Sequence, residues 1–411
     1  MNNKNCFRSD QSFMRLQRPY RYARHRTDRT GCVSFVALTL VIIGIAGVVR
    51  ERWLPLLRLP TSAALPALAD VRRALSLGQL EAVIQAGEQL MAANGQDYAA
   101  LEVLVRALVY YSETDLERDS ARERALTLTT QALRSATIQR DVLAIHAFAL
   151  YTNGQHEEAV KYALRAIDRN PQNTLARVAL AGAYASTGLF EAGLREADVA
   201  VELSQTLPEL GWEAGRVRAF ALARLGRYQE ALAAAEDAIR QRRSGLPLYF
   251  ERALYALQLG DYNAATSAYF TVLAYDSHNV KARFRLCELS SQRRETQAAL
   301  NYCTEVTERA PLFSTGWYML GREYYLQGQF RLAQQALRRC SLLEVEQRPV
   351  AERRFECWYF QGQAAEILGD CSALLAIYEE FQQMTREADL PQRWVYPPEG
   401  PAICQPSTPE A

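Results

Sequence analysis

A small residue recurs at a nearly fixed interval along this chain, and this period constrains the fold more than any other feature. The interval is 34 residues five times and 38 residues once, and it is marked by Ala125, Ala159, Gly193, Ala231, Ala265, Ala299 and Ala333. Such a period means that one supersecondary unit is copied along the chain, and that each copy buries its apolar face against its neighbours. The sequence therefore predicts a helical repeat array, an architecture typical of binding scaffolds.

Residues at fixed offsets from these seven markers predict the turns and the close contacts. Five residues before a marker, where the first helix of a unit must stop, four copies carry Gly154, Gly188, Gly226 and Gly260. Glycine adopts positive φ at little cost and suits this reversal. Seven residues after a marker, on the same face of the second helix, four copies carry Ala132, Ala166, Ala200 and Ala238. We expect the two helices of a hairpin to approach closely there.

One copy carries an almost complete family signature, composed of Trp317, Leu320, Gly321, Tyr324, Gly328, Phe330 and Ala333. With its W-x2-L-G-x2-Y spacing it resembles a tetratricopeptide repeat. The resemblance extends over roughly residues 65–381. It implies an all-α solenoid of about eight to nine helical hairpins, in which the first helix of each hairpin lines a concave groove. Weak terminal repeats are expected around Gly78 and Gly369, because end units expose a more polar face.

Three departures from the pattern carry their own expectations. Arg294 stands where a glycine is expected, and the first marked copy has an enlarged charged turn over residues 112–123. Four extra residues lie between Gly193 and Ala231 and would add about one helical turn. They predict a longer second helix near Glu202 to Pro208.

Transferring the groove register of the family gives eight candidate binding residues. One groove position falls on aromatic residues in four consecutive copies, and the other candidates lie one helical turn along or toward the middle of the array: Phe250, Phe284, Tyr318, Tyr359, Phe220, Arg322, Arg216 and Arg224. Aromatic surface with arginine is enriched at binding hot spots and could hold a peptide, its carboxylates paired with arginine, or stack on sugar rings. The alternative is that the aromatic residues pack between helices or under a returning tail.

An apolar run over residues 31–49 precedes the array and predicts one transmembrane helix. A cleaved signal peptide is the competing interpretation. The excess of arginine in the leader, residues 1–30, favours a cytoplasmic amino terminus in an inner or plasma membrane, with the repeats outside the cytoplasm. The expected domains are that leader, the span, a linker over 50–64, the solenoid over 65–384, and a proline-rich, extended or disordered tail over 385–411.

Charge is distributed unevenly along the chain. The net charge is +1, but residues 1–58 carry +8 and the remainder carries −7. A mildly acidic repeat region argues against nucleic-acid binding, which needs a basic face.

Motifs for catalysis, metal binding and phosphate binding are absent from the sequence, so we expect neither an enzyme nor a cofactor. Six of the eight cysteines lie late in the chain: Cys287, Cys303, Cys340, Cys357, Cys371 and Cys404. By repeat register Cys287 could face Cys303, and Cys340 could face Cys357. Disulfides are one interpretation of these pairs, and free thiols packed as small apolar groups are the one we favour.

These observations favour a non-enzymatic, membrane-anchored scaffold that binds protein or peptide partners and serves envelope assembly, secretion or maturation. Two alternatives remain at this point: an extracytoplasmic module for a glycan or cell-wall fragment, and a cytoplasm-facing, chaperone-like assembly factor. The sequence determines neither the partner nor the oligomeric state.

Overall fold

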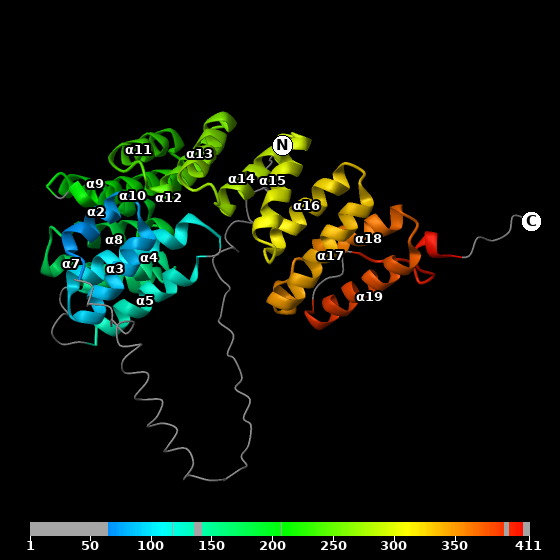
Figure 1. The fold of residues 1–411 in the computed structure, drawn as a ribbon, viewed down its shortest axis with the longest axis horizontal. Helices are drawn as coiled ribbons and strands as arrows, with labels where there is room; N and C mark the ends of the chain where they lie inside the picture. Colours follow the sequence, from blue (N-terminus) through cyan, green and yellow to red (C-terminus); the bar gives the residue numbers. More distant parts are fainter. Residues whose placement is uncertain (1–64, 117, 135–141, 207, 390–393, 406–411) are drawn as a thin grey trace, which may run out of the picture. The chain divides into compact units, whose positions relative to one another are not determined.

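The computed structural model describes residues 65–116, 118–134, 142–206, 208–389 and 394–405. Within these ranges the chain forms eighteen α-helices and no strand. The all-α prediction is confirmed, and the helices pair into nine antiparallel hairpins (Figure 1).

The first five hairpins are formed by α2/α3 (Leu68–Ser76, Leu80–Ala93), α4/α5 (Tyr98–Thr114, Ser120–Ala132), α6/α7 (Val142–Thr152, His156–Arg169), α8/α9 (Thr174–Thr187, Phe190–Ser204) and α10/α11 (Gly211–Arg224, Tyr228–Gln241). The last four are formed by α12/α13 (Leu246–Gln258, Tyr262–Tyr275), α14/α15 (Val280–Gln292, Thr296–Arg309), α16/α17 (Ser314–Leu326, Phe330–Gln347) and α18/α19 (Glu356–Ile367, Cys371–Glu387).

The 34-residue markers lie on the second helix of seven hairpins, and all seven are buried. A Cβ atom at Gly193 would lie 2.9 Å from the carbonyl oxygen of Ala181 and from the amide nitrogen of Ala185, both on the first helix of the same hairpin. The small residues are therefore required by backbone approach, as the pattern predicted.

The predicted glycine turns are confirmed at all four positions, with φ values between 76° and 96°. Arg294 occupies the equivalent place between α14 and α15 and has a φ of 58°. It is one of two non-glycine residues with positive φ in the described ranges. The turn geometry of the repeat is thus kept although its usual residue is missing.

The prediction of a longer second helix near Glu202 to Pro208 is wrong. Helix α9 ends at Ser204 and is 15 residues long, one more than α7 and α11. Part of the extra length forms a 3-10 turn, η2 (Pro208–Leu210), which leads into α10. A short turn before Gly211 lets the next helix begin against α9.

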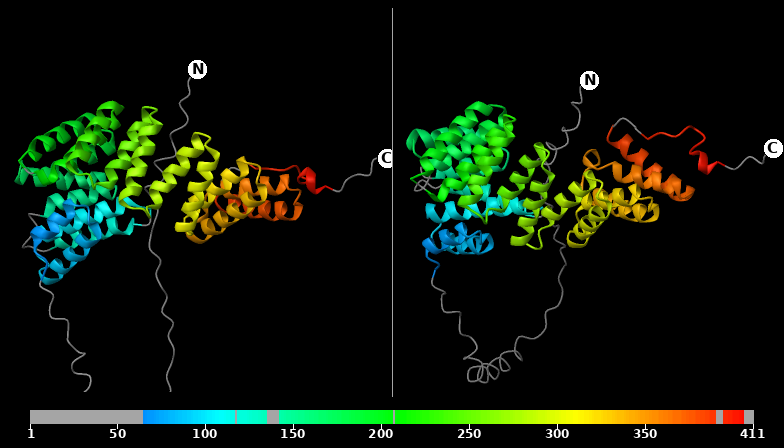
Figure 2. Two further views of the ribbon diagram at one scale, coloured as in Figure 1. Left: turned by 45° about the horizontal axis from the view of Figure 1, so that its top comes forward. Right: turned by 90° about the horizontal axis from the view of Figure 1, so that it is seen from above.

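The first hairpins lie against helices that come far later in the chain. Figures 1 and 2 show α2 to α4, in blue and cyan, beside the green helices. Arg242 donates a hydrogen bond from Nη2 to the carbonyl oxygen of Leu75, and Ser244 contacts the carbonyl of Ser76. Helix α4 also contacts α12. The array therefore curls until its start contacts its middle.

The predicted enlarged turn after α4 is shorter than expected, because α4 continues to Thr114. The turn that remains serves the curl. The carboxylate of Asp115 accepts hydrogen bonds from the backbone amides of Val280 and Lys281, at 3.2 and 3.0 Å, at the start of α14. Asn279 also donates to the carbonyl of Thr114 at 2.8 Å.

Three disulfides join the six late cysteines: Cys287–Cys303, Cys340–Cys357 and Cys371–Cys404. The preference for free thiols is therefore wrong, although the first two pairs were among the alternatives. The two cysteines of each of these pairs face one another on neighbouring helices. Their Cα atoms are 5.1 and 5.9 Å apart, a separation that a disulfide can span.

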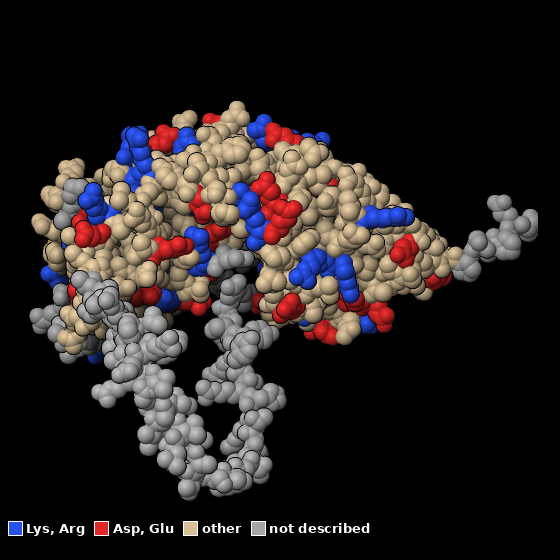
Figure 3. Space-filling model, in the orientation of Figure 1, with Lys and Arg blue, Asp and Glu red and all other residues tan. Residues whose placement is uncertain are grey.

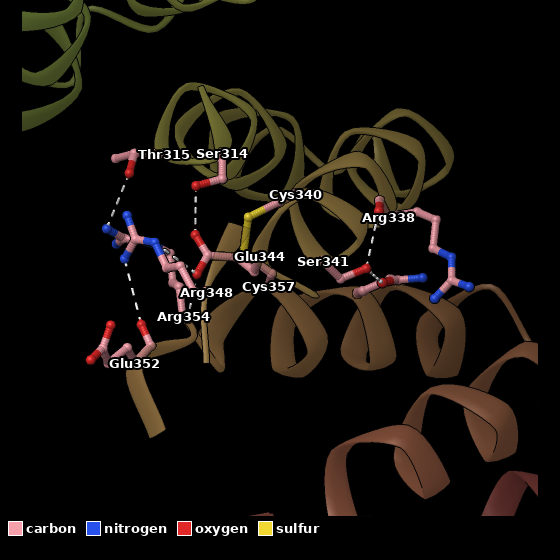
Figure 4. Close-up of a disulfide and its surroundings, with 11 residues drawn as sticks. Ser314, Thr315, Arg338, Cys340, Ser341, Glu344, Arg348, Glu352, Arg354 and Cys357 are labelled. Atoms are coloured by element: carbon pink, nitrogen blue, oxygen red, sulfur yellow. Dashed lines mark hydrogen bonds and ion pairs between the residues drawn. A yellow bond between two sulfur atoms is a disulfide. The ribbon is translucent and has the colours of Figure 1, made fainter. Parts of the chain in front are cut away.

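The Cys340–Cys357 bond joins hairpin eight to hairpin nine beside a buried carboxylate (Figure 4). Ser314 donates its hydroxyl to Glu344 at 2.5 Å, and the backbone amide of Arg354 donates to the other carboxylate oxygen at 2.9 Å. Glu344 is fully buried, so these hydrogen bonds stabilise its charge. The side chain thus joins α16, α17 and the segment before α18.

Among the described helices, none has the length and the apolar character that crossing a bilayer requires. The assignment to an inner or plasma membrane by a single span is therefore corrected. The run over residues 31–49 on which that assignment depended lies outside the described residues, as do the predicted leader and linker before residue 65.

The predicted boundary of the tail also needs correction. Helix α19 continues to Glu387, and residues 394–405 lie against the last hairpin and end in a 3-10 turn, η4 (Ala402–Cys404). This part of the tail is ordered despite its prolines, because aromatic contacts and a disulfide hold it in place.

Candidate partner-binding face

First-helix side chains of the early hairpins contact one another across the curl. Arg106 on α4 donates from Nε to Glu213 Oε1 on α10 at 3.0 Å, and the hydroxyl of Tyr110 donates to the same oxygen at 2.5 Å. All three side chains are buried. Burial alone would lower the pKa of Arg106, but the adjacent Glu213 carboxylate outweighs it and raises the pKa. The polar side chains on the first helices of the early repeats thus bind other residues of the same chain.

Arg216, the first predicted site residue, belongs to the same closed region. Its guanidinium forms ion pairs with Glu113 on α4 and Glu251 on α12, at 2.6 and 2.7 Å. Burial raises the pKa of Glu251, and Arg216 opposes this rise. Both acidic partners come from the chain itself, so Arg216 holds α4, α10 and α12 together.

The next two predicted residues lie on α10 near its end. Phe220 is half-buried in a cluster with Leu222 and Ala231. Arg224 is exposed, donates from Nε to the carbonyl oxygen of Ala185 at 3.2 Å, and lies 5.1 Å from the ring centre of Phe190. Arg224 therefore caps the end of α8 while part of it faces solvent.

Phe250 and Phe284 occupy equivalent register positions but have different surroundings. Phe250 is half-buried, and the ammonium of Lys281 lies 4.6 Å above its ring. Phe284 is only 4% exposed and packs edge-to-face against Phe313 at 5.2 Å. Phe284 is thus a core residue of hairpin seven.

Tyr318 and Arg322 lie one turn apart on α16, and both are half-exposed. Arg322 donates to the hydroxyl of Ser291 at 3.0 Å, and the guanidinium of Arg354 lies 4.8 Å from the ring centre of Tyr318. Burial raises the pKa of the Tyr318 phenol, so this group is protonated and can donate a hydrogen bond at neutral pH. Arg354 was missed by the sequence reasoning because it precedes α18 and lies outside the repeat register.

Tyr359 lies on α18 beside a short hydrogen-bonded chain. Tyr325 donates to Gln363 at 3.2 Å, and Gln363 donates to the hydroxyl of Tyr359 at 2.8 Å. Phe360 lies among Tyr318, Tyr325 and Tyr359, with ring centres 5.4 to 6.3 Å apart. The structure therefore brings Tyr318 and Tyr359 together through Phe360, which the register did not single out.

We use the name distal face for the first-helix residues of hairpins eight and nine and the arginine between them: Tyr318, Arg322, Tyr325, Arg354, Tyr359 and Phe360. All six side chains are half-exposed. The Nε atom of Arg354 is buried and lacks a hydrogen-bond partner within the described ranges. An aromatic surface with two guanidinium groups can stack on flat or apolar groups and pair with carboxylates.

The side chains of the distal face are aromatic or basic. Nowhere in the part of the chain that the structure describes do three His, Cys, Asp or Glu residues gather as a metal site. On the side drawn in Figure 3, basic and acidic side chains are interspersed over the surface.

Comparison with known proteins agrees with this architecture. Residues 146–208 and 314–344 each match a family model described as tetratricopeptide repeat. These two stretches, one in the early and one in the late hairpins, are therefore similar to tetratricopeptide repeats. The crystal structure of the APC/C hetero-tetramer Cut9–Hcn1 is similar in fold, with a TM-score of 0.51 and 16% identity, over 78% of this chain and 60% of that chain.

Two further similarities are more limited. The C-terminal part of a TPR repeat-containing protein from Cytophaga hutchinsonii has a TM-score of 0.48 and 12% identity, over 59% of this chain and 95% of that one. The Vi polysaccharide export protein VexE of Salmonella typhi is 29% identical over 183 residues, which is 44% of this chain. This chain spans about a quarter of that relative, 26% of its length.

Proposed function

We propose that this protein is a non-enzymatic scaffold that binds a protein or peptide partner through the distal face. The observation that supports this is the contrast between two arginines at groove positions. Arg216 is held between two carboxylates of its own chain, at 2.6 and 2.7 Å, and its side chain is 20% exposed. Arg322 has a longer ion-pair contact, to Glu323 at 3.4 Å, and its side chain is 37% exposed beside the aromatic residues of the distal face. The closed early repeats would act as a rigid base, and the later hairpins would carry the partner.

The chemistry of the distal face suggests a partner that has carboxylates for the arginines and flat or apolar groups for the aromatic rings. Arg322 and Arg354 can each pair with a carboxylate, and the tyrosine rings offer apolar area with fixed geometry. Tyrosine loses little rotamer freedom on binding, so its contact area is gained at low entropic cost. We infer a role in the assembly or export of other molecules, in which the scaffold gathers proteins.

A second candidate ligand is a polysaccharide, and the similarity to a polysaccharide export protein favours it. Sugar rings would stack on Tyr318 and Tyr359, with the arginines at the rim. The two ligands differ in their dependence on charge. Peptide binding should weaken strongly in Arg322→Ala and at high salt, whereas sugar binding should depend chiefly on Tyr318 and Tyr359.

The test is quantitative capture of partners by the full chain and by the double variant Tyr318→Ala with Arg322→Ala. The matched control replaces an exposed tyrosine and an exposed arginine on second helices, Tyr275→Ala with Arg331→Ala. The proposal expects capture to be lost in the first variant and kept in the control, with equal helical content and Tm. A large loss of stability in the first variant would instead assign these side chains to the core.

A further inference from the structure

The segment after α19 occupies a specific surface of the last hairpin. Trp394 is 6% exposed, although no helix or strand contains it. Its ring contacts Tyr359 on α18 and Tyr378 and Phe381 on α19, with ring centres 5.8, 5.1 and 5.3 Å apart. An isolated aromatic residue buried on two helices has the environment of a bound ligand side chain.

Gly362 makes room for this ring. A Cβ atom at residue 362 would lie 2.1 Å from the Trp394 indole, too close for any side chain. Gly362 lies inside α18, where glycine costs roughly 1 kcal/mol relative to alanine. The helix therefore carries an unfavourable residue at the one place where the indole enters.

Polar contacts fix the direction of the segment two residues later. The backbone amide of Tyr396 donates to the hydroxyl of Tyr378 at 3.1 Å, and the Tyr396 hydroxyl donates to Glu366 at 2.7 Å. Pro397 and Pro398 follow directly. The surface of the last hairpin thus binds a tryptophan and a tyrosine that lie two residues apart in an extended segment followed by prolines.

The Cys371–Cys404 disulfide ties the far end of this segment to the start of α19. Both of its cysteines are half-exposed, whereas the four cysteines of the other two disulfides are fully buried. Thiol exchange needs access to a sulfur atom, so an external reductant reaches this bond first. The accessible bond is therefore the one that controls the segment.

We propose that the last hairpin is a binding site for an extended Trp-x-Tyr segment. In the oxidised protein the chain's own tail fills this site. Reduction of the Cys371–Cys404 disulfide opens the site to the same segment of a second copy of the protein. This site shares Tyr359 with the distal face, but the proposal does not rest on the partner binding proposed above. A thiolate of a small thiol or dithiol protein attacks one sulfur of the bond and forms a mixed disulfide. A second thiol then releases the reductant as a disulfide and leaves thiols on Cys371 and Cys404. The tail then keeps only its backbone connection to α19, and the local concentration of its far end at the site falls.

The probe is a fluorescent synthetic peptide with the sequence of residues 394–405 and serine in place of its cysteine. The full-length variant Trp394→Ala with Cys404→Ser presents a vacated site and should bind the probe in a polarisation titration. Adding Gly362→Ala to that variant should weaken binding at least tenfold, while helical content stays the same because alanine favours the helix. The wild type needs no substitution: reduced protein should bind the probe at least tenfold more tightly than oxidised protein.

Alkylation during mild reduction checks the order of opening, and Cys371 and Cys404 should be labelled before the four buried cysteines. The proposal is overturned by failure of the vacated variant to bind the probe, by binding that Gly362→Ala leaves unchanged, or by equal binding to oxidised and reduced wild type.

Discussion

Arg106 and Glu213 are 107 residues apart in the chain and form a buried ion pair between α4 and α10. The pair is shared with Tyr110, whose hydroxyl donates to the same carboxylate oxygen. Its position at the centre of the curl means that the early repeats are held as one closed body rather than as an open spiral. The loss of either charge would leave the other buried with a weaker partner, Glu102 for Arg106 and the Tyr110 hydroxyl for Glu213.

The first prediction concerns this pair. Glu213→Ala should lower the free energy of unfolding by about 3 kcal/mol, because buried Arg106 would keep only the longer ion pair with Glu102 at 3.3 Å. The matched control is Glu230→Ala, which breaks the exposed pair with Arg227 and should leave the free energy of unfolding close to that of the wild type. Urea unfolding followed by circular dichroism measures both, and equal effects would mean that the buried pair does not hold the curl.

The second prediction concerns the strained turn at Arg294. Replacing this exposed residue by glycine should raise the free energy of unfolding by about 0.5–1 kcal/mol, since glycine adopts positive φ without the usual steric cost. The reverse change at the equivalent turn, Gly260→Ala, should lower it by about 1 kcal/mol, because φ there is 76° and the surrounding space is open. Opposite signs are the expected result of thermal melts; the same sign for both would refute the turn argument.

The third prediction is a pH dependence that arises at Lys281. Burial lowers the pKa of this amine to about 8, against the opposing effect of Glu113 and with the help of Arg285 and Arg216. Between pH 8 and the ordinary value of 10.5, the unfolded chain binds a proton that the folded chain has lost. Stability should therefore rise with pH across that window, by about 1–2 kcal/mol between pH 8 and pH 9.5.

Urea unfolding at these two pH values measures the effect. Lys281→Met keeps most of the packing and should show no rise, whereas Lys161→Met, at an exposed site, should behave like the wild type. A rise that persists in Lys281→Met would assign the titration to another group.

The fourth prediction separates core from surface in the aromatic stripe. Phe284→Ala should cost about 3–5 kcal/mol of stability, because the ring is buried against Phe313. Tyr318→Ala should cost clearly less, since Tyr318 is half-exposed on the distal face. Chemical denaturation ranks the two variants, and the reverse order would place Tyr318 in the core.

The fifth prediction tests the disulfides. Digestion without reduction should give three linked peptide pairs that contain the six late cysteines, and full reduction should lower Tm. Mass spectrometry identifies the pairs. Six unlinked, alkylated cysteines would show that these positions are packed as free thiols.

The hairpins could be predicted from the sequence because their determinants are local. Ala159 and Gly226 lie within one hairpin of the groups that they contact or connect, so a repeated spacing reveals them directly. The same register placed Cys287 opposite Cys303 and Cys340 opposite Cys357. Phe250 and Phe284 show its limit, since equivalent positions differ in burial once neighbouring side chains are considered.

The sequence by itself determined the repeat, its turns and the faces of its helices, because these depend on residues within about forty positions of one another. Only the tertiary structure decided that Arg216 is paired with its own chain, that Arg354 joins the distal face, and that Trp394 fills the space above Gly362. Arg354 and Trp394 lie outside the helices of the repeat, so its register does not place them. The pairing of Arg216 with Glu113 depends on small rotations between hairpins that accumulate along the array. No local sequence pattern encodes the accumulated rotation of several hairpins. Contacts between residues more than a hundred positions apart therefore have no signal in the sequence.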